Sequence, residues 1–212
     1  MEATRLIAVR HGETAWNVDT RIQGQLDIGL NATGEWQARR VGQALAEEAI
    51  DVIYASDLSR AWDTALEIAR PLKLQVRPEP RLRERAFGRF EGMSFAEIEK
   101  ALPDQAKLWR ERDPEFAPDG GESLIVFRDR VTTVASELAA RHAGELVVLV
   151  AHGGVMDVLY RAATRQDLQA PRTWLLRNAA INRILWTPEG FSLVGWSDET
   201  HLTDAPRDEA TA

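Results

Sequence analysis

The chain has 212 residues, a formal net charge of −7 and no cysteine. This length suffices for one domain with a substantial core, and the negative charge argues against a nucleic-acid partner. The lack of cysteine excludes disulfides, a thiolate nucleophile and cysteine-ligated zinc. The sequence shows neither a basic start followed by a long apolar run nor any apolar stretch of about 18 residues. We therefore expect a cytoplasmic protein with no membrane partner.

The first predicted strand, 6–9, is apolar throughout, which is typical of a strand buried on both faces of a parallel sheet. It runs directly into Arg10, His11 and Gly12. A neutral imidazole can attack phosphorus, and a neighbouring guanidinium can hold two phosphoryl oxygens, so this pair indicates phosphoryl transfer. The alternative interpretation is an exposed arginine beside a histidine that only ends the strand.

Predicted helices and strands alternate along the remaining chain, and Asn31 should cap the first helix. The helices are expected over 32–48, 56–69, 94–102, 104–112, 123–141 and from Gly154 to about 163. The further strands are expected over 51–55, 74–76, 146–150, 181–186 and 191–196. Pro71 should follow the end of the second helix, and Pro78 should lie beyond the strand over 74–76.

This alternation predicts an α/β fold. We expect a three-layer sandwich with a mostly parallel central sheet, helices on both faces and the last two strands as a C-terminal edge hairpin. No repeat or linker divides the chain, so residues 1–202 should form one domain, with 85–121 as a lid-like insertion. Residues 203–212 are polar and are predicted to be a disordered tail.

Three predicted strands end in polar clusters, at Arg10–Gly12, at Ser56–Arg60 and at His152–Gly154. The carboxyl ends of parallel strands meet at one edge of a sheet, so these clusters should share a crevice. There Arg10, Arg60 and His152 can surround a phosphoryl group, and the Gly153 and Gly154 amides can add donors at a helix start. Taken singly, Arg60 is more typical of an exposed helix face, and His152 of a strand-end histidine.

Four segments carry a family resemblance, namely 10–17, 56–65, 82–88 and 151–154. They resemble the histidine phosphatase superfamily, in the branch that contains cofactor-dependent phosphoglycerate mutases and related phosphatases. The segments span most of the chain and occur in the family's order. The resemblance implies that His11 becomes phosphorylated and that Glu84 is the proton donor. It also implies phosphate or substrate contacts from Arg10, Asn17, Gln23, Arg60 and His152, with Gly153 at the helix start.

Glu84 lies within the charged run Arg81–Arg85, and this pattern alone is typical of a solvated surface. The resemblance reverses that interpretation. A carboxyl group beside a bound phosphate can protonate a leaving alkoxide, which makes Glu84 the candidate general acid.

The predicted function is hydrolysis of a small-molecule phosphomonoester through a phosphohistidine on His11, with Glu84 as general acid and base. One alternative is a cofactor-dependent phosphoglycerate mutase, and another is a non-catalytic phosphate-binding regulatory protein. The chain is short for a mutase, and the segment 85–92 looks more like that of the phosphatases. The resemblance implies no metal and no cofactor, except a 2,3-bisphosphoglycerate primer if the chain is a mutase. It also allows a homodimer.

The substrate itself is left open by the sequence. Aromatic residues near the insertion can form part of a lid, although packing is the commoner role; they are Phe87, Phe90, Trp109 and Phe116. Basic residues there can favour a second anionic group on the substrate, although a solvated surface is the commoner role; they are Arg85, Arg89, Lys107 and Arg110.

Overall fold

The computed structural model describes residues 2–203. At its centre is a six-stranded sheet in the order β3-β2-β4-β1-β5-β6. The strands are β1 (Thr4–Arg10), β2 (Val52–Ala55), β3 (Val76–Pro78), β4 (Leu146–Ala151), β5 (Ile181–Thr187) and β6 (Gly190–Asp198). The pairs β2–β3, β2–β4 and β1–β4 are parallel, whereas β5 runs antiparallel to β1 and to β6. The mostly parallel sheet with an edge hairpin is confirmed.

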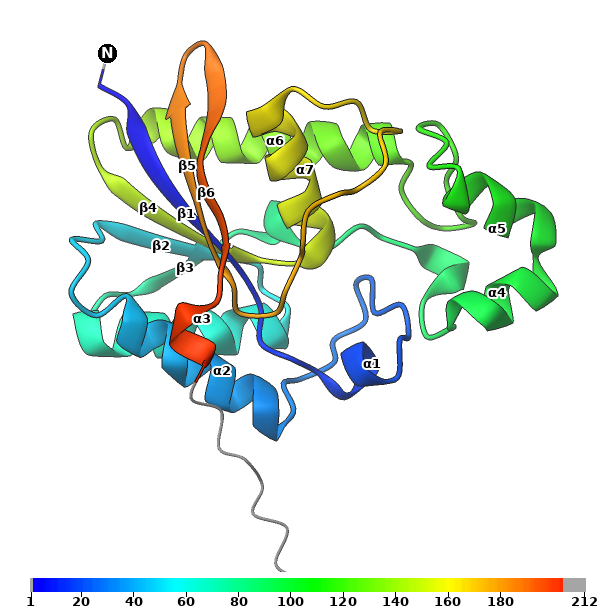
Figure 1. Ribbon diagram of the computed structural model, residues 1–212, viewed down its shortest axis with the longest axis horizontal. Helices are drawn as coiled ribbons and strands as arrows, with labels where there is room; N and C mark the ends of the chain where they lie inside the picture. Colours follow the sequence, from blue (N-terminus) through cyan, green and yellow to red (C-terminus); the bar gives the residue numbers. More distant parts are fainter. Residues whose placement is uncertain (1, 204–212) are drawn as a thin grey trace, which may run out of the picture.

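Helices cover both faces of this sheet. The α-helices are α1 (Ala15–Val18), α2 (Ala32–Ala44), α3 (Ser59–Leu72), α4 (Phe95–Ala101), α5 (Pro103–Arg110), α6 (Leu124–Arg141) and α7 (Gly153–Thr164). Short 3-10 helices are η1 (Pro80–Leu82), η2 (Gly88–Phe90) and η3 (Thr200–Leu202). In Figure 1, α2 and α3 lie below the sheet and α6 and α7 above it, which gives the three layers predicted. Within residues 2–203, no helix is long and apolar enough to cross a membrane.

The apolar residues of β1 pack into two separate hydrophobic cores. Leu6 and Ala8 pack with α6 and α7, whereas Ile7 and Val9 pack with α2 and α3. All four side chains are almost completely buried, because successive residues of a strand point to opposite faces of the sheet. A strand covered on both sides has no need of polar alternation, which explains the unbroken apolar sequence.

The segment 85–121 carries α4 and α5, which project beyond one end of the sheet (Figure 1). It has a small core of its own, centred on the buried residues Phe90, Ile98 and Ala106. The ring of Trp109 packs against this core, with its centroid 5.5 Å from that of Phe90. The insertion is therefore a packed unit beside the main domain, and its closure over a substrate stays a prediction.

Several predicted boundaries are wrong. The strand expected at 74–76 is β3, Val76–Pro78, in which Pro78 pairs with Ala55; proline is tolerated because β3 is an edge strand. Pro71 does not follow α3 but lies inside its last turn. The first helix ends at Ala44 rather than near 48, and the short α1 was not expected. Of the predicted disordered tail, residues 204–212 lie outside the described chain.

Candidate active site

The ends of β1, β2 and β4 bring the predicted residues together at one edge of the sheet. The amide of His11 donates to Ala151 O at 3.0 Å, and the amide of Ser56 donates to Val150 O at 3.0 Å. These hydrogen bonds extend the parallel pairing of the strands by one residue into the loops that follow them. As a result the imidazole rings of His11 and His152 lie with centroids 5.2 Å apart and planes tilted by 59°. The predicted convergence of distant segments is confirmed.

His11 is buried and held in one tautomer. Its Nδ1 lies 2.7 Å from the carbonyl oxygen of Gly12, which can only accept, so Nδ1 carries the proton and donates it. Burial, reinforced by the charges of Arg10 and Arg60, lowers the pKa of His11 well below its usual value. The ring is therefore neutral, and its Nε2 has a free lone pair for attack on an electrophile.

Glycine at position 12 permits a close approach of α2 to this loop. A Cβ atom on Gly12 would lie 2.4 Å from Gly34 O, and one on Gly34 would lie 2.0 Å from Glu13 O. The amide of Gly12 also donates to Thr64 Oγ1 at 3.1 Å. Two helices thus fix the backbone that carries His11.

Two guanidinium groups flank the imidazoles. Arg60 is only 1% exposed, so the interpretation as a solvated helix-face arginine is wrong. Its Nη1 and Nη2 donate to Leu26 O and Gly24 O, each at 2.8 Å, and Arg10 Nη1 donates to Leu176 O. Burial lowers the pKa of Arg10 to about 10, which leaves it charged at neutral pH. The Nε atoms of Arg10 and Arg60 are buried and have no hydrogen-bond partner in the described chain.

His152 presents a third buried nitrogen of this kind. Its Nε2 lies 2.8 Å from Ser56 Oγ, whereas its Nδ1 has no partner within residues 2–203. Burial first, and then the neighbouring Arg60, His11 and Arg10, lower its pKa well below the usual value. A neutral ring that accepts from Ser56 at Nε2 carries its proton on Nδ1.

Glu84 is half-buried beside the start of α7, so the interpretation as a solvated member of a charged run is wrong. Its Oε1 accepts from the Arg85 amide at 2.8 Å, and its Oε2 accepts from the Gly154 amide at 2.9 Å. The Gly154 amide, expected to serve a phosphoryl group, thus binds this carboxylate instead. Gly153 lies against Arg10, since a Cβ on it would be 3.4 Å from Arg10 Nε.

Asn17 lies in α1 and Gln23 in the loop that follows α1. Asn17 Oδ1 accepts from the Thr14 amide at 3.1 Å and from Asn178 Nδ2 at 3.3 Å. Gln23 is buried, and its Oε1 accepts from Thr14 Oγ1 at 3.0 Å. Asn178 also donates to His11 O at 2.9 Å. Sequence reasoning gave Thr14 no role, although it lies within the segment 10–17, and missed Asn178 because no local pattern distinguishes that residue.

A cavity of about 560 Å³ opens beside Glu84. It is lined by Arg10, Glu84, Arg85, Phe87, Trp109, Arg112, Leu124, Phe127, Gly153, Gly154, Asp157, Val158, Leu168, Arg172, Trp174, Leu175 and Leu176. Its size suits a small organic ligand. Sequence reasoning missed Arg112, Asp157 and Arg172, which come from loops and α7.

The four basic residues weighed for a second anion differ in their positions. Arg85 lines the cavity, but it is buried and donates to Glu122 O at 2.8 Å and Phe116 O at 2.9 Å. The other three, Arg89, Lys107 and Arg110, do not line it. Arg110 is exposed and pairs with Glu99 at 2.9 Å. Of the aromatic residues, Phe87 and Trp109 line the cavity, whereas Phe90 packs inside the insertion.

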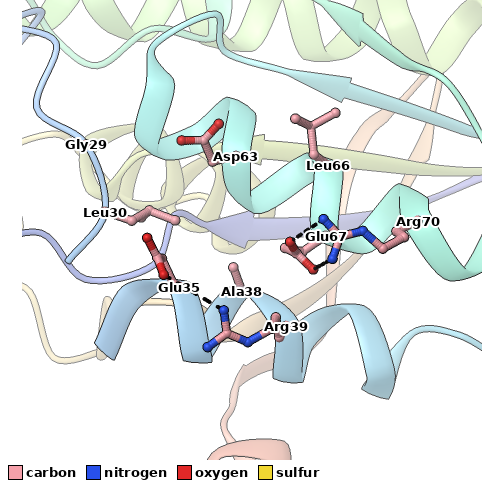
Figure 2. Close-up of a pocket in the computed structure, with 9 residues that line it drawn as sticks. All are labelled: Gly29, Leu30, Glu35, Ala38, Arg39, Asp63, Leu66, Glu67 and Arg70. Carbon is pink, nitrogen blue, oxygen red and sulfur yellow. Dashed lines mark hydrogen bonds and ion pairs between the residues drawn. The ribbon is translucent and has the colours of Figure 1, made fainter. Parts of the chain in front are cut away.

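A second cavity, of about 380 Å³, lies between α2 and α3 (Figure 2). Four of its charged side chains pair within a helix, with Arg39 3.9 Å from Glu35 and Arg70 2.8 Å from Glu67. Burial, and after it the negative charges of Asp27 and Glu35, raise the pKa of Asp63. It shares no lining residue with the cavity beside Glu84, and none of the predicted site residues lines it.

Residues 2–203 contain no cluster of three or more side chains able to hold a metal ion.

Comparison with known proteins agrees with this geometry. The model of the histidine phosphatase superfamily (branch 1) matches residues 6–199. Two similar proteins come from Arabidopsis thaliana. Phosphoglycerate mutase-like protein 4 is 36% identical over 208 residues, covering 96% of this chain and 89% of that protein. Metal-independent phosphoserine phosphatase is 37% identical over 209 residues, covering 95% and 84%.

Among solved structures, a mycobacterial glucosyl-3-phosphoglycerate phosphatase complexed with VO3 superimposes with a TM-score of 0.81. It is 33% identical, and the match covers 92% of this chain and 99% of that one. The Entamoeba histolytica phosphoserine phosphatase in complex with 3-phosphoglyceric acid gives a TM-score of 0.84 at 28% identity, covering 94% and 99%. The family-model match, the relatives and the shared fold lead to one conclusion: this chain belongs to branch 1 of the histidine phosphatase superfamily.

Proposed function

We propose that the protein is a phosphatase that hydrolyses a small phosphomonoester through a phosphohistidine on His11. The observation that carries the proposal is a set of three buried nitrogens around the two imidazoles. Arg10 Nε, Arg60 Nε and His152 Nδ1 have no hydrogen-bond partner in the described chain. A buried donor without an acceptor is costly, and the three nonbridging oxygens of a phosphoryl group would supply acceptors.

The first step transfers the phosphoryl group to the enzyme. Nε2 of His11 attacks phosphorus in line, the bond from phosphorus to the ester oxygen breaks, and Glu84 protonates the departing oxygen. The charges of Arg10 and Arg60 and the His152 N–H stabilise the charge on the transferring group. The Gly12 carbonyl accepts from Nδ1 of His11, which keeps the attacking nitrogen unprotonated.

The second step regenerates the enzyme. Water attacks the phosphohistidine, Glu84 accepts a proton from it, and the phosphorus–nitrogen bond breaks to release inorganic phosphate. Asn17, Gln23 and the Gly153 amide are proposed to contact the phosphoryl group or the adjoining substrate. No metal takes part, in keeping with the metal independence in the name of the Arabidopsis phosphoserine phosphatase.

The main alternative is a mutase that returns the phosphoryl group to a reoriented intermediate, with a 2,3-bisphosphoglycerate primer. The relatives carry both kinds of name, including a probable phosphoglycerate mutase of Proteus mirabilis that is 35% identical over 210 residues. The short segment after Glu84 and the relatives named as phosphatases favour hydrolysis. A non-catalytic phosphate-binding protein is disfavoured because both imidazoles, both guanidiniums and the Glu84 carboxyl are present. A cytoplasmic location and a homodimer stay part of the proposal.

Rapid-quench labelling tests the intermediate. A ³²P-labelled phosphomonoester should give an acid-labile label on wild-type protein and none on His11→Asn, whose turnover of p-nitrophenyl phosphate should fall by at least about 10³-fold. The matched control His201→Asn should keep both. A His11→Asn variant with near wild-type turnover would overturn the proposal.

Product analysis separates the alternatives. With 3-phosphoglycerate and a trace of 2,3-bisphosphoglycerate, a phosphatase releases inorganic phosphate faster than it forms 2-phosphoglycerate, and a mutase does the reverse. Vanadate binding without hydrolysis of any ester in a broad panel would indicate the non-catalytic protein.

A further inference from the structure

Four arginines line the cavity beside Glu84, and three of them donate hydrogen bonds to acceptors of the protein itself. Arg10 donates to Leu176 O, and Arg85 donates to two main-chain carbonyls. Arg112 donates to Leu168 O at 2.6 Å and to Asp157 Oδ2 at 2.9 Å. These arginines build the wall of the cavity.

Arg172 is the exception. Within residues 2–203 it donates no hydrogen bond, and its closest charged partner is Asp157 Oδ1, 3.9 Å from its Nε. Its side chain is 45% exposed, so it can reach a ligand that enters the cavity. It is also near enough to Arg10 for its charge to contribute to the lowered pKa of Arg10. A guanidinium whose five N–H groups make no hydrogen bond in the described chain therefore lines the same cavity as Arg10 and Glu84.

The backbone on both sides of Arg172 is anchored, although this loop lacks regular structure. Arg161 donates to Ala170 O at 2.9 Å, two residues before it. Two residues after it, the ring of Trp174 stacks on Tyr160 with centroids 4.1 Å apart, and the Arg161 guanidinium lies 4.7 Å from the Trp174 ring centroid. The loop thus presents Arg172 at a defined place while leaving its side chain free to bind.

Trp174 supplies a second donor on the same wall. Its side chain is buried, and its Nε1 has no hydrogen-bond partner in the described chain. Of the two carboxylates that line the cavity, Glu84 accepts from main-chain amides, whereas Asp157 accepts from Arg112 and Arg161 through Oδ2 and faces Arg172 through Oδ1. Three guanidiniums thus share one carboxylate, so this end of the cavity has an excess of positive charge and of N–H donors.

We propose that Arg172, with the indole N–H of Trp174, binds an acidic group on the alcohol portion of the substrate. This inference rests on the proposed phosphatase function and deepens it: the preferred substrate is a phosphomonoester whose leaving group carries a carboxylate or a second phosphate. A guanidinium binds either anion through paired N–H···O bonds, and the indole N–H adds a single donor. The apolar walls from Phe87, Trp109 and Leu176 accommodate the carbon skeleton between the two anions.

The experiment compares esters that differ only in the acidic group. Phosphate release is measured with 3-phosphoglycerate and glycerol 3-phosphate, which differ by a carboxylate in place of a hydroxymethyl group. Fructose 1,6-bisphosphate and fructose 6-phosphate form the second pair, so the two pairs distinguish a carboxylate from a second phosphate. We expect wild-type protein to prefer the acidic member of at least one pair. Arg172→Gln should lower that preference, as the ratio of kcat/KM values, by about 10- to 100-fold, mainly through KM.

Two further variants separate binding from loss of structure. Trp174→Phe keeps an aromatic ring against Tyr160 but removes the N–H, and it should lower the same ratio by several-fold. Arg177→Gln is the matched control, because Arg177 lies in the same loop, is exposed, pairs with Glu199 and does not line the cavity. Its ratio should equal that of wild type.

The outcomes distinguish this inference from the proposed function. The inference is overturned if both wild type and Arg172→Gln hydrolyse the neutral esters and have the same ratio of kcat/KM values for the acidic over the neutral ester. The phosphatase proposal would still stand in that case. A ratio lowered equally by Arg177→Gln would also overturn it. No turnover of any ester, p-nitrophenyl phosphate included, would overturn both.

Discussion

The Oγ atom of Ser56 lies 2.8 Å from Nε2 of His152, across 96 positions of sequence. Ser56 stands at the end of β2 and His152 at the end of β4, which are paired in parallel. Either tautomer of His152 can make this contact, with the Ser56 hydroxyl as donor or as acceptor. If the hydroxyl donates to Nε2, the N–H is at Nδ1, one of the three nitrogens assigned to the phosphoryl group.

Replacing Ser56 by alanine should therefore impair catalysis without removing any group that contacts substrate. Loss of the hydroxyl lets the His152 proton move to Nε2, and we expect kcat/KM for p-nitrophenyl phosphate to fall about tenfold, equivalent to ~1.4 kcal/mol. Ser59→Ala is the matched control, since that hydroxyl donates to Asp27 at 2.7 Å on the surface. Equal activities of the two variants would contradict the tautomer assignment.

Glu84→Gln should show an effect that depends on the leaving group. An alkoxide needs a proton as it departs, whereas p-nitrophenolate is stable without one. Loss of the carboxyl should lower the rate for an alkyl phosphate by about 10²- to 10⁴-fold, and the first step for p-nitrophenyl phosphate much less. Single-turnover kinetics with both esters would measure this difference. A uniform decrease would assign Glu84 to positioning rather than to proton transfer.

Stability should fall as the pH is lowered below about 6.5. The pKa of His11 is lowered in the folded protein, chiefly by burial, so the unfolded chain binds its proton first as the pH falls from neutrality. This one group contributes a loss of ~1.4 kcal/mol per pH unit between its unfolded value, 6.5, and its lowered folded value. Urea unfolding at a series of pH values should give a shallower dependence for His11→Asn than for wild type. An unchanged slope would show that the pKa of His11 is the same in the folded and unfolded states.

A methyl group at position 34 should disturb the loop that carries His11. A Cβ there would meet Glu13 O at 2.0 Å, a main-chain atom that cannot turn aside. We expect Gly34→Ala to cost about 1–3 kcal/mol in the free energy of unfolding and to lower kcat. Gly29→Ala is the control, because no atom lies within 4 Å of its added Cβ. Denaturant melts and steady-state kinetics on both variants would test whether the close approach matters.

The sequence predicts the layers of this fold well because they depend on local patterns. The apolar runs of β1 and β4 are continuous, and both strands are buried on both faces. The short β3 was misplaced because three residues carry little pattern. Pro71 was expected after α3, yet proline in a last turn lacks only one hydrogen bond of the helix.

Charged residues of the site are harder to predict, because their burial depends on segments far away in the sequence. The Arg60 guanidinium donates hydrogen bonds to the carbonyls of Gly24 and Leu26, and the Glu84 carboxylate accepts one from the amide of Gly154. Local pattern assigns both side chains to solvent. The convergence of strand ends places Arg60 in the shared crevice, and only the family resemblance adds Glu84. Arg172 belongs to no motif, so its position beside Asp157 emerged only from the folded chain.

The two ends of the active-site region come from different kinds of structural element. At the phosphoryl end, Arg10, His11 and His152 stand at or directly after the ends of strands, and Arg60 lies in the first turn of α3. At the other end, Phe87 and Trp109 belong to the insertion and Trp174 to an irregular loop. We expect an exchange of those outer segments to alter selectivity and to leave the groups at the phosphoryl end in place. This division of labour gives a physical reason why proteins of one architecture can bear names as different as phosphoserine phosphatase and glucosyl-3-phosphoglycerate phosphatase.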